Sequence, residues 1–115
     1  MKLLTKGIEK AFKRVGDQAN KKLDDIIIVA KFFNPCGGQT WFAASYHPAD
    51  RSFFGFASLF GDHNDEWGYF SLDELQAIKG PLGLGIERDI HFEPKLFNEA
   101  KKSLPKESSA NYGGA

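Results

Sequence analysis

The sequence predicts an α+β fold, with a mainly antiparallel sheet of four or five strands and two or three helices packed on one face. Three apolar runs at residues 26–33, 40–46 and 52–60 are rich in β-branched and aromatic residues, as strands are. Connections of about five residues join them, which favours antiparallel neighbours because parallel strands need crossovers of a dozen or more. Helical patterns at both ends and one in the middle complete the α+β prediction.

An amphipathic helix is expected first. Thr5 is its expected N-cap, and Gly16 with Asp17 can split the segment into a helix and a looser turn. Apolar residues recur at three- and four-residue spacing, so we expect all of them on the inward face: Leu4, Ile8, Ala11, Phe12, Val15, Ala19 and Leu23.

The run IIIVAKFF at 26–33 is almost unbroken, which predicts one strand buried on both faces. NPCGG at 34–38 is a turn, and TWFAASY at 40–46 is the next strand. In the third strand, SFFGFASLF, Gly55 is expected at a bulge or at a close contact between backbones. A meander of these strands is the simplest topology.

The central helix begins at a capping box, with Ser71 as N-cap and Glu74 three residues later. It is expected to run to Lys79 and to stop at Gly80 and Pro81. The glycines of GPLGLG have the spacing GxxGxG, which reverses the dinucleotide-binding order, and they follow a helix instead of a strand. We therefore interpret these glycines as structural.

Residues 87–93, ERDIHFE, are predicted to form another strand. Alternation would place four polar residues on one face, Glu87, Asp89, His91 and Glu93, and would turn Arg88, Ile90 and Phe92 toward the core. Arg88 there would need a carboxylate or carbonyl partner. The polar face is either the hydrated side of a half-exposed strand or a site that holds a divalent ion or shares a proton.

Pro94 is expected at position N1 of a last helix over 95–103, with Leu96, Phe97, Ala100 and Leu104 inward. The 115 residues then form one globular domain at 1–104, followed by a flexible tail at 105–115. Fifteen basic and fifteen acidic residues balance. The basic residues gather at the two ends, and together they are the candidate nucleic-acid-binding set: Lys6, Lys10, Lys13, Arg14, Lys21, Lys101 and Lys102.

Cys36 is the only cysteine, so no disulfide can form within the chain and a reducing compartment is expected. The chain has no secretory leader pattern and no apolar run long enough to cross a bilayer, which predicts a cytoplasmic protein that does not bind membranes. No catalytic triad, nucleotide loop or metal-ligand set is recognisable. We expect no catalytic residues, no metal and no cofactor.

Three segments resemble one family: LLTKGIEKAF, KFFNPCGGQTWFAASYHP and GYFSLDELQAIKGPLGLGIERDIHFEP. They are similar to small bacterial, plasmid and phage proteins of the family called domain of unknown function 2958. The resemblance implies an origin in mobile elements or their hosts, and it implies no activity.

Three functions follow as hypotheses. The first is a non-enzymatic accessory protein of a mobile genetic element or phage that acts through a protein partner. The second is a nucleic-acid-binding accessory protein that uses the basic helices, which requires those helices to lie side by side. The third is a metal-dependent enzyme built on Glu87, Asp89 and His91. The sequence leaves the oligomeric state open.

Overall fold

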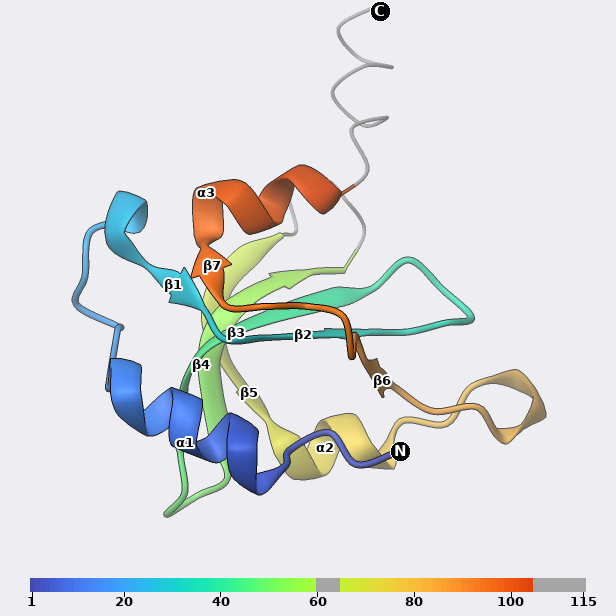
Figure 1. Ribbon diagram of the computed structural model, residues 1–115. Coiled ribbons are helices and arrows are strands. Elements are labelled where there is room, and N and C mark those ends of the chain that lie inside the picture. Colours follow the sequence, from blue (N-terminus) through green and yellow to red (C-terminus); the bar gives the residue numbers. More distant parts are fainter. Residues whose placement is uncertain (60–64, 105–115) are drawn as a thin grey trace, which may run out of the picture.

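The computed structural model describes residues 1–59 and 65–104. Five strands form an antiparallel sheet in the order β5-β4-β3-β2-β6 (Figure 1). Two further strands, β1 (Ile27–Ile28) and β7 (Lys95–Leu96), form a separate antiparallel pair. The strands of the larger sheet are β2 (Ala30–Phe33), β3 (Thr40–His47), β4 (Ser52–Ser58), β5 (Glu66–Ser71) and β6 (Glu87–Arg88). The predicted meander of three strands is confirmed as β2 to β4, and β5 extends it by a strand that was not predicted.

Three α-helices pack on this sheet, α1 (Lys6–Val15), α2 (Leu72–Ala77) and α3 (Phe97–Ala100). The α+β class is therefore confirmed. The helices do not share one face as predicted: α1 and α2 cover one side of the sheet, and α3 covers the other (Figure 1). The reason is that strand residues alternate between two apolar sides, so both sides need cover. Within the described residues, no helix is long and apolar enough to cross a membrane.

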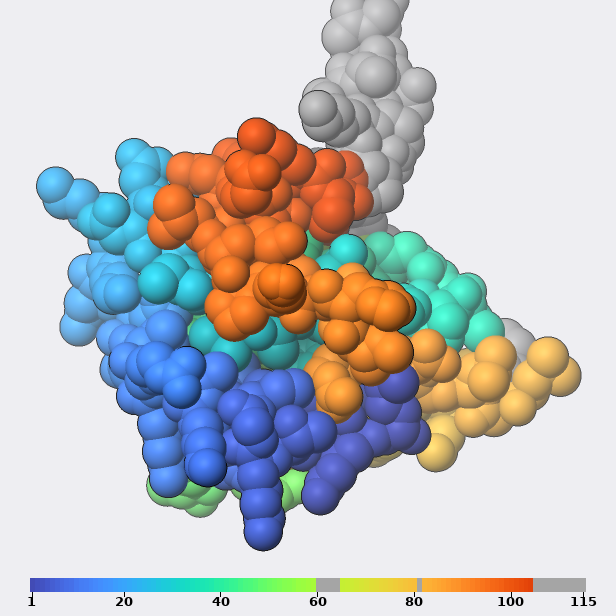
Figure 2. All heavy atoms as spheres, in the orientation of Figure 1, coloured from blue at the N-terminus to red at the C-terminus, as the bar shows by residue number. Residues whose placement is uncertain are grey.

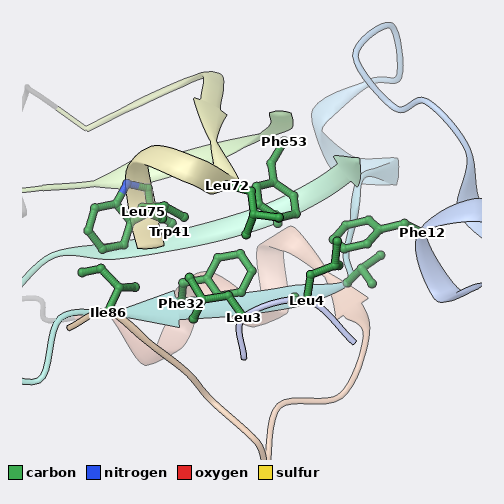
Figure 3. Close-up of a cluster of buried hydrophobic side chains, with 12 residues drawn as sticks. Leu3, Leu4, Phe12, Phe32, Trp41, Phe53, Leu72, Leu75 and Ile86 are labelled. Atoms are coloured by element: carbon green, nitrogen blue, oxygen red, sulfur yellow. The ribbon is translucent and has the colours of Figure 1, made fainter. Parts of the chain in front are cut away.

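The larger core lies between the sheet and α1, α2 and the N-terminal segment (Figure 3). The Phe53 ring lies at its centre, 5.7 Å from the ring of Phe12 and 5.3 Å from that of Phe32. Leu72 and Leu75 of α2 are buried there together with Ile86. Burial of such side chains stabilises the fold by roughly 1.5–3 kcal/mol each.

A second core fills the space under α3. The Phe97 ring lies 4.6 Å from that of Trp67 and 5.1 Å from that of Phe56. Its other buried residues are Ile26, Ile28, Phe42, Ala44 and Ala100. Trp67 is thus partly buried against this core, and its strand β5 extends the predicted meander.

The first helix ends earlier than its apolar pattern. Thr5 caps it as predicted, since its Oγ1 accepts a hydrogen bond from the Ile8 amide. The helix ends at Val15 because Gly16 adopts a φ of 70°, a conformation that favours glycine. Leu23 then lies in a short 3-10 helix and is 46% exposed, so its predicted inward position is wrong.

The predicted single strand 26–33 is divided at Val29. The Val29 amide donates to the Ala43 carbonyl, whereas Ile28 pairs with Lys95 and Ala30 pairs with Ala43. The two halves therefore belong to different sheets. An unbroken apolar run shows that both faces are buried, but it does not show where the pairing partner changes.

Two helix boundaries also differ from the prediction. Ser71 caps α2 as expected, but α2 ends at Ala77, and Gly80 and Pro81 belong to the loop that follows. The last helix does not begin at Pro94, because Lys95 and Leu96 form β7 first. Leu96 is consequently exposed, while Phe97 and Ala100 are buried as predicted.

Gln18 is fully buried and connects three parts of the chain. Its Nε2 donates to the carbonyl oxygens of Ile27 and Ala44 at 2.7 Å, and its Oε1 accepts from the Ile27 amide at 2.8 Å. Its own amide donates to the Ser45 Oγ at 2.8 Å. Ala44 and Ser45 lie where the β3–β4 register shifts. Gln18 therefore satisfies the backbone groups that this bulge and the edge strand β1 leave open.

We predict that Gln18→Met lowers the free energy of unfolding by about 2–4 kcal/mol, because it fills similar space but leaves buried backbone groups unpaired. Urea denaturation measures the change. Gln76→Met, at an exposed position of α2, is the control and should change stability by less than about 0.5 kcal/mol. Equal stabilities of the two variants would contradict the role of Gln18.

Gly55 and Gly68 provide a second comparison of a test variant with a control, since the two glycines lie opposite each other on β4 and β5. A Cβ at Gly55 would meet the Phe42 carbonyl oxygen at 1.9 Å, which confirms the predicted close backbone contact, whereas one at Gly68 would meet nothing within 4 Å. Gly55→Ala should therefore cost about 1–3 kcal/mol, and Gly68→Ala should be neutral or slightly stabilising. A thermal melt in which both variants behave alike would refute this contact.

Candidate functional site

The most irregular part of the fold lies along the outer edge of β1 and β2. Arg88 pairs with Phe32 and Lys95 pairs with Ile28, both antiparallel. Between these two pairs, the segment that carries Arg88 and Lys95 has six residues (89–94), whereas the β1–β2 segment has three (29–31). Three extra residues of the first segment must therefore leave the ladder. We call residues 89–94 the edge bulge.

A turn at Asp89 starts the edge bulge. The Asp89 amide still donates to the Lys31 carbonyl at 2.9 Å, as in a regular ladder. The next two bonds return to Asp89 itself: its Oδ1 accepts from the His91 amide at 2.9 Å and its carbonyl accepts from the Phe92 amide at 3.2 Å. A short acidic side chain thus replaces the neighbouring strand as the acceptor.

The strand predicted over 87–93 is consequently wrong beyond Arg88. Ile90, predicted to face the core, is 62% exposed. Phe92 packs into the second core, where its ring lies 6.4 Å from that of Phe42. Glu93 is exposed and does not line the pocket described below. The predicted polar face does not exist as a flat strand face.

Arg88 has a carbonyl partner, one of the two kinds that the sequence required. Its Nη1 donates to the Lys2 carbonyl, and its amide donates to the Met1 Sδ. The guanidinium is therefore directed toward the N-terminal segment, on the side of the larger core. Among the described residues it forms no ion pair with a carboxylate.

Residues 78–86 form a projecting loop, which we call the apolar loop. It is closed by a bridge between Lys79 and Gly85 and by the Gly80 amide, which donates to the Leu84 carbonyl. Leu82 lies at its tip with a φ of 63° and is 96% exposed. Leu84 and Ile78 are also exposed, which gives the loop an apolar surface. The glycines lie at the closure of this loop, and strand β6 follows them where a dinucleotide-binding motif would have a helix.

The apolar loop packs against the β2–β3 turn. A Cβ at Gly80 would lie 3.7 Å from the Cβ of Cys36 in that turn. Figure 1 shows both segments projecting from the same end of the molecule, and Figure 2 shows their surfaces in contact. Segments that are more than forty residues apart in the sequence therefore form one end of the domain.

A pocket of about 530 Å³ opens at this end, between the β2–β3 turn and the start of the edge bulge. Its size is within the range of small-ligand sites. Glu87, Asp89 and His91 line one wall, so three of the four predicted polar-face residues do reach a common cavity. Phe33 lies beside Glu87 on the neighbouring strand and beside Thr40 on the next one, and all three line the pocket together with Lys31 and Arg88.

The charged side chains of this pocket differ in the hydrogen bonds and ion pairs that they form. The Lys31 Nζ donates to the Ser103 Oγ at 3.3 Å and lies 5.9 Å above the Phe42 ring, so it is directed toward the second core. The described ion pairs are Arg51–Asp73 and Lys102–Glu99, neither of which involves the pocket. Glu87 and Asp89 form no ion pair among the described residues, although Met1, Lys31 and Arg88 line the same pocket.

The described groups with shifted pKa lie at the opposite end of β3 and in the turn after it. Burial raises the pKa of the Tyr46 phenol. The Asp73 carboxylate, which accepts a hydrogen bond from the Arg51 Nε, raises the pKa of that guanidinium. Thr40, at the start of β3, marks the pocket end.

No three His, Cys, Asp or Glu side chains of residues 1–59 and 65–104 lie close enough together to hold a metal ion. The turn at Asp89 explains this for the predicted candidates, because Asp89 and His91 no longer alternate along an extended strand. Glu87, Asp89 and His91 share a pocket without forming a ligand set.

The basic candidates are distributed over both sides of the molecule. Lys6, Lys10, Lys13 and Arg14 lie on α1, and Lys21 is exposed after it. Lys101 and Lys102 lie in the 3-10 helix that follows α3, on the other side of the sheet (Figure 1). The two basic segments therefore do not lie side by side, which the nucleic-acid hypothesis required.

The fold and the pocket define a small α+β domain with one elaborated end, where a turn, a loop and an edge bulge meet. The chain belongs to the family described as Protein of unknown function (DUF2958), whose profile matches residues 3–99. No curated protein and no solved structure is significantly similar to the chain. The family resemblance read from the sequence is thereby confirmed.

Sequence reasoning missed the apolar loop and the contribution of the β2–β3 turn to the site. One signal for the loop was present: Leu82 and Leu84 stand between glycines, where helix and strand patterns both fail. For Asn34 and Gln39 no local signal existed, since only the pairing of β6 with β2 brings the turn beside Glu87.

Proposed function

We propose that this protein is a non-catalytic accessory protein that binds another protein through its elaborated end. We further propose that it acts in the cytoplasm as part of a mobile genetic element or phage, a setting that the family resemblance suggests. The observation that supports protein binding is Leu82, an almost completely exposed leucine at the tip of a projecting loop.

Leu82 costs the isolated protein stability in two ways. A non-glycine residue in the left-handed region costs about 1–2 kcal/mol. An exposed leucine also forgoes the roughly 1.5–3 kcal/mol that burial of its side chain would contribute. The backbone bonds of Gly80, Gly83 and Gly85 hold the loop in this conformation. A projecting apolar residue held in this way is suited to insert into an apolar pocket of a partner.

Photo-crosslinking tests this proposal. Benzoylphenylalanine placed at position 82 of the full chain, expressed in its native host, should form a discrete crosslinked product with another protein. The control carries the same group at position 23, where Leu23 is also an exposed leucine but lies on a different element. Products that are identical from both positions, or no product from position 82, would refute protein binding at this end.

Leu82→Gly provides the functional test. Glycine accepts the positive φ, so the variant should fold at least as stably as the parent chain. Capture of the crosslinked partner should nevertheless fall by about tenfold, because the buried leucine contact is lost. Leu23→Gly, the matched control, should leave capture unchanged. Unchanged capture by Leu82→Gly would contradict the proposal.

A further inference from the structure

We propose that two copies of this protein form a dimer in which their β5 strands pair antiparallel, edge to edge. This contact lies at the edge of the sheet opposite β6 and goes beyond the proposed function, which uses the elaborated end. β5 is the outermost strand in the order β5-β4-β3-β2-β6, so only β4 pairs with it among the described residues. Its outer edge is a row of backbone groups to which another strand can bond.

The hydrogen bonds to β4 determine which backbone groups of β5 face outward. The Leu72 amide donates to the Arg51 carbonyl at 2.9 Å, in the same register as the pairs of the β4–β5 ladder. Bonded and non-bonded pairs alternate in an antiparallel ladder, so the even-numbered residues of β5 bond to β4. The odd-numbered residues, among them Trp67 and Tyr69, therefore direct their amides and carbonyl groups away from β4.

The outer edge of β5 lacks the features that commonly keep sheet edges from pairing. Residues 66–71, EWGYFS, contain no lysine and no proline, and their pairing with β4 shows no register shift. Tyr69 adds apolar surface at this edge, since it is 63% exposed and its ring lies 5.4 Å from that of Phe54. Such an edge is suited to bind a strand through its main chain.

A second copy is the strand that this edge fits. Two identical edges related by a two-fold axis close on each other and leave neither edge free to recruit further chains. Charge does not oppose the contact, because the chain has fifteen basic and fifteen acidic residues. Glu66 is the only charged residue of β5, so the edges themselves carry little repulsion.

The two-fold axis of this dimer lies at Gly68. In that register Gly68 faces its counterpart, and the two backbones meet without side chains between them. Trp67 of each copy then faces Tyr69 of the other, which gives aromatic cross-strand pairs that exchange both of their N–H···O bonds. Glu66 faces Phe70, so no like charges lie opposite each other.

Sedimentation equilibrium of the full chain tests the dimer. The parent chain should sediment as a dimer at about 100 µM, a concentration that detects a small interface of moderate affinity. Tyr69→Lys places a charge on the outer edge and should raise the dissociation constant at least about tenfold. Leu84→Lys, the control, replaces another exposed apolar residue by lysine, on the apolar loop, and should leave the dimer unchanged.

A cysteine at position 68 tests the register. A Cβ at Gly68 would meet nothing within 4 Å, so Gly68→Cys should fold. The two cysteines would have Cα atoms about 4.5 Å apart, within disulfide reach, and should link the copies under mild oxidation. Glu66→Cys is the control, because its Cα atoms would lie about 14 Å apart in the same dimer. Both variants also carry Cys36→Ser, since Cys36 is exposed and free.

A parent chain that sediments as a monomer at this concentration would overturn the dimer. Protection of its β5 amides from hydrogen exchange only when another protein is added would then identify a foreign strand as the occupant. A dimer that Leu84→Lys weakens more than Tyr69→Lys does would place the contact at the elaborated end instead. Disulfide formation by Glu66→Cys as rapid as by Gly68→Cys would contradict the pairing about Gly68. The crosslink from position 82 tests the proposed function separately.

Discussion

The interrupted pairing along the β1–β2 edge is the constraint on which the elaborated end depends. Residues 87–88 and 95–96 pair with the same edge in registers that differ by three residues. Three extra residues cannot be accommodated in a regular antiparallel ladder, so the chain must leave the edge between the two pairs. Asp89 supplies the bonds for this departure, and the wall of the pocket results from it.

This arrangement requires that both parts of the edge are fixed in position. β2 is fixed by the larger sheet, where it pairs with β3 over four residues. β1 has no such support, and the buried amide of Gln18 takes that role by bonding to both polar groups of Ile27. The two cores then secure the ends of the bulge, because Ile86 packs in the first and Phe97 in the second.

Sequence patterns predicted where helices and strands occur better than they predicted which strands pair with each other. Thr5, Ser71 and Gly55 were identified correctly, since caps and close backbone contacts leave a local signature. The division at Val29 and the bulge after Arg88 depend on which strand lies alongside. The periodicity of apolar residues does not show which strand that is. The pocket combines a turn with a segment about fifty residues later. Its carboxylates could be proposed from the sequence, but the contribution of the β2–β3 turn could not.

Amide hydrogen exchange across residues 87–97 tests the central claim most directly. Slow exchange is expected at Asp89 and Phe97, whose amides donate to the carbonyls of Lys31 and Ile26, and fast exchange is expected at Glu93 in the bulge. A regular strand would instead bond the amides of alternate residues, 89, 91 and 93. Exchange at Glu93 as slow as at Asp89 would show that the strand continues and would contradict the edge bulge, and with it the pocket.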